Sequence, residues 1–146
     1  MSNAETARRL YQTITDHDPE AGAALVADDA EWTDVPTGQT YRGKEGWRQQ
    51  YHFWLGAFPD GQVEITNLVD GGDWVVIEYT GRGTNTGPLL TPEGELPATN
   101  RSVELPFCDV SHFSDGKFAG GRSYYDLASM MTQLGLGAEV PAGAIS

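Results

Sequence analysis

SVELPFCDVSHFSDGKFAGGRSYYD, residues 102–126, has the pattern of two strands joined by a tight turn. Between Val103 and Phe113, every second residue belongs to one largely apolar stripe, which alternates with Glu104, Pro106, Cys108, Val110 and His112. Asp115-Gly116 is a typical two-residue turn, and it leads back into Phe118–Asp126. The stretch therefore predicts an antiparallel hairpin with one face against an apolar core.

Upstream of this hairpin, the chain predicts helices first and strands afterwards. Ser2 and Glu5 form a capping box, and Asp18 before Pro19 is a second helix start, with that helix ending near Asp28. The longest helix has a wide apolar stripe and ends before Pro59. The remaining expected elements are a strand at 31–34, a turn at 37–43, the long helix at 44–58, a hairpin of 63–69 with 74–79, and a last helix at 127–134 ended by Gly135.

Helices followed by hairpins predict an α+β fold with a single domain over residues 1–146. We expect one curved antiparallel sheet, shaped as a cone, with the N-terminal helices on its concave face and an enclosed apolar cavity between them. The irregular segment Gly87–Asn100 is a candidate lid. The Gly, Ala and Pro-rich residues 138–146 are expected to form a flexible tail.

The charge of the chain limits its partners. The formal net charge is -12 with only nine Lys and Arg residues, which argues against nucleic acid and anionic membranes. A small uncharged molecule is the expected partner. A single cysteine, Cys108, fits a reducing compartment, and the cytoplasm is the expected location. No His or Cys pair has metal-ligand spacing, and no phosphate-binding glycine loop is found, so neither site is predicted.

Asp109 is the residue that most clearly breaks its own pattern, because it places a carboxyl group on the inward stripe. Burial disfavours the charged form of Asp and can bring its pKa near neutrality, where it can transfer protons. A structural alternative exists. In a regular hairpin Arg122 lies directly opposite Asp109 and forms an ion pair with it, whereas a bulge separates the two.

Two further residues are candidates for the same chemistry. Asp34, at the end of a short strand, is a possible base at the cavity mouth, or an aspartate that hydrogen-bonds its own turn. Tyr11, on the buried face of the first helix, is a possible oxyanion donor, or a packing residue. Asp126 either lines the cavity or caps the last helix, and we favour the cap.

The inward aromatic residues predict the surface that binds a substrate. The expected set is Trp32, Trp47, Tyr51, Trp54 and Phe107, together with Arg122 and Tyr124 on the last strand.

Several short motifs occur along the chain in a characteristic order and spacing. They are Gly43-Lys44-Glu45-Gly46, Ala57-Phe58-Pro59-Asp60, Gly83-Thr84-Asn85-Thr86-Gly87-Pro88, Asp115-Gly116-Lys117 and Gln133-Leu134-Gly135. Together they resemble the SnoaL-like polyketide cyclases and predicted ester cyclases of the NTF2-like superfamily, and the resemblance covers most of the chain. It implies a homodimer of cones, no cofactor, and acid-base chemistry on a hydrophobic carbonyl compound, such as an intramolecular aldol ring closure.

The chain departs from those cyclases at the catalytic positions. Their acid is an aspartate directly after the residue that matches Arg122, and this chain has Ser123 there. Their accompanying histidine matches Asp109. The family mechanism therefore cannot be transferred residue by residue.

Ala27-Asp28-Asp29-Ala30 followed by Asp34, with Asp109-Val110 further on, is similar to ketosteroid isomerases. This resemblance implies Asp34 as the general base, and a protonated Asp109 with Tyr11 as the oxyanion donors. The leading hypothesis is then a cofactor-independent enzyme that forms an enolate, for cyclisation or isomerisation.

Three alternatives remain open. An epoxide hydrolase or hydratase is one, because Arg122–Asp126 resembles the limonene epoxide hydrolases. A non-catalytic protein that binds a hydrophobic ligand is another, and an interaction scaffold like transport factor two is the third. Convergence of Asp34 and Asp109 on one cavity would favour an enzyme.

Overall fold

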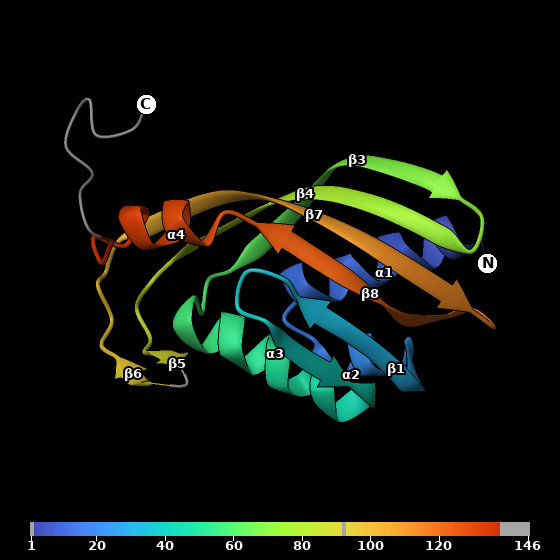
Figure 1. Ribbon diagram of the computed structural model, residues 1–146, viewed down its shortest axis with the longest axis horizontal. Helices are drawn as coiled ribbons and strands as arrows, with labels where there is room; N and C mark the ends of the chain where they lie inside the picture. The colour runs from blue at the N-terminus through green and yellow to red at the C-terminus, as the bar shows by residue number, and fades with distance from the viewer. Residues whose placement is uncertain (1, 92, 138–146) are drawn as a thin grey trace.

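The computed structural model describes residues 2–91 and 93–137, and over these residues the chain forms an α+β fold around one curved sheet (Figure 1). The strand order of this six-stranded sheet is β2-β1-β8-β7-β4-β3, and β5 and β6 pair as a separate small hairpin. The elements are α1 Asn3–Thr15, α2 Pro19–Ala23, β1 Val26–Asp34, β2 Gln39–Arg42, α3 Gly43–Ala57, β3 Gln62–Gly71, β4 Trp74–Thr84, β5 Leu89–Thr91, β6 Gly94–Leu96, β7 Ser102–Ser114, β8 Lys117–Tyr125 and α4 Leu127–Gln133.

Three helices begin at the caps predicted from the sequence. The Ser2 hydroxyl accepts a hydrogen bond from the backbone N–H of Glu5 and donates one to its carboxylate, both at 3.1 Å. Asp18 caps α2 through the N–H of Ala21 at 3.1 Å. Asp126 caps α4 at 2.9 Å, which confirms the cap and removes Asp126 from the candidate site.

The region between α2 and α3 differs from the prediction. The second helix ends at Ala23, β1 begins at Val26, and the predicted turn at 37–43 contains strand β2. In addition, β1 pairs in parallel with β8, so the sheet is antiparallel except at this one pairing. The partner of β1 lies about ninety residues away, and a local pattern with two consecutive aspartates does not reveal such a pairing.

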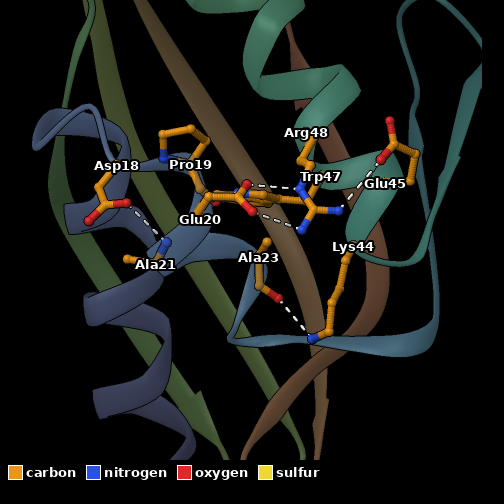
Figure 2. Close-up of polar contacts among 9 residues, drawn as sticks. All are labelled: Asp18, Pro19, Glu20, Ala21, Ala23, Lys44, Glu45, Trp47 and Arg48. Atoms are coloured by element: carbon orange, nitrogen blue, oxygen red, sulfur yellow. Dashed lines mark hydrogen bonds and ion pairs between the residues drawn. The ribbon is translucent and has the colours of Figure 1, made fainter.

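Polar contacts fasten α3 to the short helix α2 (Figure 2). The guanidinium of Arg48 donates to the carboxylate of Glu20 at 2.8 and 2.9 Å, and the Lys44 ammonium donates to the carbonyl of Ala23 at 3.0 Å. The Trp47 indole N–H donates to the carbonyl of Pro19 at 3.1 Å, and its ring is 8% exposed. These contacts fix which face of α3 is turned towards the sheet.

The segment Gly87–Asn100 is more ordered than the sequence suggests. It contains the β5–β6 hairpin, and Leu89 is buried in a core cluster with Phe58 and Leu105. The buried amide of Asn85 closes the base of the segment, because it donates to the carbonyls of Ala57 and Gly87 and accepts from Thr99. The predicted tail, residues 138–146, lies outside the described residues. None of the described helices combines the length and apolarity needed to cross a membrane.

Candidate functional site

A cavity of about 140 Å³ lies between the sheet and the helices that cover it. This is similar to the roughly 150 Å³ cavity that admits benzene in an engineered protein, so a single ring fits. The five aromatic residues predicted to bind substrate all line it: Trp32, Trp47, Tyr51, Trp54 and Phe107. Tyr11 and Met130 contribute from α1 and α4, and the wall is largely apolar.

A bulge in the β7–β8 hairpin decides which side chains face this cavity. Phe113 pairs with Phe118, but His112 pairs with Gly120, so Ala119 is an extra residue in β8. As a result Asp109 lies opposite Ser123, and Arg122 lies opposite Val110. The alternative of an ion pair between Asp109 and Arg122 is therefore wrong, and the bulge separates the two residues as expected for an irregular hairpin.

The same bulge corrects the expected roles of Arg122 and Tyr124. Part of Arg122 borders the cavity, but its side chain is exposed and donates to the Tyr124 hydroxyl at 3.0 Å. Tyr124 is 41% exposed, on the face of the sheet away from the helices. The prediction that Tyr124 lines the cavity is wrong, because one inserted residue reverses the direction of every side chain after it.

Asp109 belongs to the cavity wall and has an unusual environment. The Tyr11 hydroxyl donates to Oδ2 of Asp109, while Oδ1 is buried without a hydrogen-bond partner among the described residues. Burial raises the pKa of Asp109 to about 6, and the negative charge of Asp34 adds to the rise. The hydroxyls of Ser123, Tyr11 and Tyr79 oppose it by stabilising the carboxylate. Such a carboxyl exchanges protons readily near neutral pH.

Asp34 lies next to this group but deeper in the protein. It is 2% exposed, pairs in register with Ser123, and accepts a hydrogen bond from the Tyr125 hydroxyl at 3.1 Å. Its Oδ1 also has no partner among the described residues, and burial raises its pKa. Among the described residues that line the cavity, Asp34 is absent. The structure thus brings Asp34 close to Asp109 without placing both on the cavity surface.

Three polar residues near the cavity were missed on sequence alone. Tyr79 is on the inner face of β4, and the bulge turns Tyr125 inward. Gln50 lines the cavity from α3, and its Oε1 accepts from the Trp32 indole N–H at 2.8 Å. A signal for Gln50 exists, because it lies three residues after Trp47 and four before Trp54, within the apolar stripe.

The model of the SnoaL-like polyketide cyclase family matches residues 4–134. The chain belongs to this family. Among curated protein sequences, none matches the chain. The family assignment confirms the resemblance seen in the sequence motifs.

Solved structures show the ketosteroid isomerase-like fold of this SnoaL-like protein. IdmH from Streptomyces antibioticus, described as a candidate polyketide cyclase, is 27% identical with a TM-score of 0.74, over 90% of this chain and 96% of that one. A candidate SnoaL-like cyclase from Jannaschia is 23% identical with a TM-score of 0.78, over 90% of each chain. A protein from Catenulispora acidiphila in complex with trimethylamine is 23% identical with a TM-score of 0.77, over 97% and 100%.

Two buried carboxyl groups, Asp34 and Asp109, lie at or beside the cavity of this SnoaL-like protein. Within residues 2–91 and 93–137, no cluster of three or more His, Cys, Asp or Glu residues has the arrangement of a metal site. Ser123 occupies the place where the family resemblance expects an acid, and Asp109 lies beside it on β7. The apolar wall thus carries a carboxyl group, that of Asp109, one strand away from the position where the resemblance places the acid.

Proposed function

We propose that this protein transfers protons at a carbon next to the carbonyl group of a small hydrophobic, polyketide-like molecule, without a cofactor. The observation that carries the proposal is the Asp109 carboxyl, which lies on the wall of an apolar cavity and is held by Tyr11. The description of IdmH as a candidate polyketide cyclase supports the substrate class.

In the proposed reaction, the Asp109 carboxylate removes the proton on the α-carbon, and the electron pair of that C–H bond moves into an enolate. The enolate then takes back a proton at another carbon, which isomerises a double bond, or attacks a second carbonyl of the same molecule, which closes a ring. In the second case, Asp109 returns its proton to the new alkoxide. A pKa near 6 keeps Asp109 mostly ionised at neutral pH while leaving it basic enough for this step.

This proposal changes the roles expected from the sequence. Asp34 was the expected base, but the described cavity wall does not include it, so we assign the base to Asp109. Tyr11 was an expected oxyanion donor, but its hydroxyl already donates to Asp109, and its pKa is raised well above the ordinary value because it is buried. We therefore propose Tyr11 and Asp34 as positioning residues that set the direction and basicity of Asp109.

The test is loss of deuterium from cyclohexanone deuterated at both α-carbons, followed by proton NMR. The wild-type protein is expected to accelerate the exchange above the buffer rate, and Asp109→Asn is expected to lose roughly 10²- to 10⁴-fold of the acceleration. Asp115→Asn, on the exposed turn between β7 and β8, is the matched control. Equal exchange by wild type and Asp109→Asn would reject the proposal.

A non-catalytic binding protein is the second candidate function, and Ser123 at the family's acid position is the observation that favours it. The same experiment separates the two. A binding protein retains cyclohexanone in the cavity but leaves its exchange at the buffer rate, whatever residue is at position 109.

The resemblance to homodimeric cones also leads us to propose dimerisation through the uncovered face of the sheet. Val69, Val76 and Val110 form a row across β3, β4 and β7 on this face, and Val69 is 52% exposed. Trp74, 45% exposed, packs against the His112 ring with centroids 5.0 Å apart. Val110→Glu is expected to convert a dimer into a monomer in light scattering. A wild-type monomer would overturn this proposal.

A further inference from the structure

We infer that Gln50 is a second ligand contact, and that its side-chain N–H holds the carbonyl oxygen of the ligand from the α3 side of the cavity. The role of Gln50 in stabilising an enolate rests on the proposed function. Its contact with the carbonyl oxygen of a bound ketone does not, because binding requires no catalysis. The inference deepens the proposed function by assigning the group that stabilises the negative charge on the enolate oxygen.

The orientation of the Gln50 amide follows from its partner. An indole N–H is only a donor, so the atom of Gln50 that lies 2.8 Å from Trp32 Nε1 must be the acceptor, Oε1. Trp32 is 5% exposed and packs against the rings of Tyr41 and Phe118. A buried tryptophan held in this way keeps Oε1 of Gln50 at a fixed place in the cavity wall. The amide nitrogen, which carries two N–H donors, then has no hydrogen-bond partner among the described residues.

The position of Gln50 suits a carbonyl oxygen. The residues of α3 that line the cavity with it are Trp47, Tyr51, Trp54, Leu55 and Phe58, so Gln50 carries the amide of an otherwise aromatic and aliphatic surface. Asp109 lines the same cavity from β7, in the sheet, whereas Gln50 lines it from α3. A ring between them can direct its oxygen to the helix and its α-carbon to the carboxylate.

The chemistry of the two groups also selects the ligand. An uncharged amide stabilises an enolate oxygen as charge develops on it, and it does so most strongly where water is excluded. A carboxylate ligand is disfavoured, because Asp109 and Asp34 both place negative charge beside the cavity. We therefore assign the ligand to neutral ring-sized ketones, or to longer polyketide-like molecules that insert one such ring.

The experiment compares binding of cyclohexanone with binding of cyclohexane, which has the same ring and lacks the oxygen. Gln50→Met keeps the length of the side chain but removes the donor, and is expected to weaken cyclohexanone binding roughly tenfold while leaving cyclohexane unchanged. Gln49→Met, on the exposed side of α3, is the matched control. Gln50→Glu, measured at a pH where the new carboxyl is ionised, keeps an acceptor for Trp32 and is expected to show the same selective loss.

The indole N–H resonance of Trp47, which donates to the carbonyl of Pro19, reports whether each variant keeps its fold. A loss that is equal for the two ligands, or no loss for either, would overturn the role of Gln50. Asp109→Asn separates this inference from the proposed function, because it is expected to abolish exchange and to keep the Gln50-dependent preference for cyclohexanone. Selective binding without exchange in the wild-type protein would reject the catalytic proposal and leave the Gln50 contact standing.

Discussion

Asp34 and Asp109 lie on either side of Ser123 in one row of the sheet, on β1 and β7. Each has one carboxyl oxygen buried without a partner among the described residues, and the charge of Asp34 raises the pKa of Asp109. Burial is the largest cause of that shift, and the charge of Asp34 is a smaller one. The basicity of the cavity group therefore depends on a residue outside the cavity.

Asp34→Asn is expected to lower the pKa of Asp109 below about 6, because it removes the neighbouring negative charge. The rising limb of the exchange rate against pH, which follows the carboxylate form of Asp109, is then expected to shift to lower pH. Carboxyl carbon NMR titration of Asp109 measures the change directly. Asp29→Asn, at an exposed position of β1, is the control, and an unchanged or higher pKa in Asp34→Asn would contradict the coupling.

Tyr11→Phe is expected to have the opposite effect. In the wild type, the hydrogen bond from Tyr11 stabilises the Asp109 carboxylate and lowers its pKa. Its loss is therefore expected to raise the pKa of Asp109 and to shift the exchange profile to higher pH. The same titration checks this, with Tyr124→Phe on the exposed face as the control. Shifts of the same sign in Tyr11→Phe and Asp34→Asn would show that one of the two contacts does not act as described.

The raised pKa of Asp109 predicts how the free energy of unfolding depends on pH. Between the ordinary value of 3.8 and about 6, the folded protein binds more protons than the unfolded chain, so this group's contribution to stability is present at low pH and lost as the pH rises. The interval corresponds to about 3 kcal/mol. Urea unfolding across this pH range is expected to show a smaller loss in Asp109→Asn than in the wild type, because only the raised pKa of Asp34 then contributes. Parallel pH dependences would contradict it.

Gly121 is expected to tolerate no side chain. Its φ is +148°, and a Cβ would lie 2.1 Å from the carbonyl oxygen of Val110. Gly121→Ala is expected to lower the free energy of unfolding by at least roughly 2 kcal/mol, through both backbone strain and this clash. Gly116→Ala is the comparison, because Gly116 has a φ of +75° but open space around it. Chemical denaturation of the two variants separates strain from clash, and equal stabilities would contradict the account.

Much of the fold was accessible from the sequence because its signals are local. The caps at Ser2, Asp18 and Asp126 depend on residues three positions away, and the turn at Asp115-Gly116 joins strands that are neighbours in the chain. The parallel pairing of β1 with β8 depends on distant residues, so it left no local pattern.

The candidate site could be predicted only in part, because some of its features depend on strand register and leave no local signal. Asp109 was found because a carboxyl on an apolar stripe is visible in the sequence, and the structure places it on the cavity wall. The orientation of Arg122, Tyr124 and Tyr125 depends on one bulged residue in a run of small residues, Ala119-Gly120-Gly121, where the alternation of apolar and polar side chains cannot show the register.

The bulge at Ala119 also means that a change of one residue would alter the group that faces Asp109. Deleting Ala119 would restore the regular register, bring Arg122 opposite Asp109, and turn Ser123 and Tyr125 to the outer face. The Asp109 carboxyl would then form a salt bridge with Arg122, and the group that we propose as the base would be held in an ion pair. Under the proposed function, the presence of one extra residue in this hairpin thus decides whether the cavity can transfer protons or only bind a ligand.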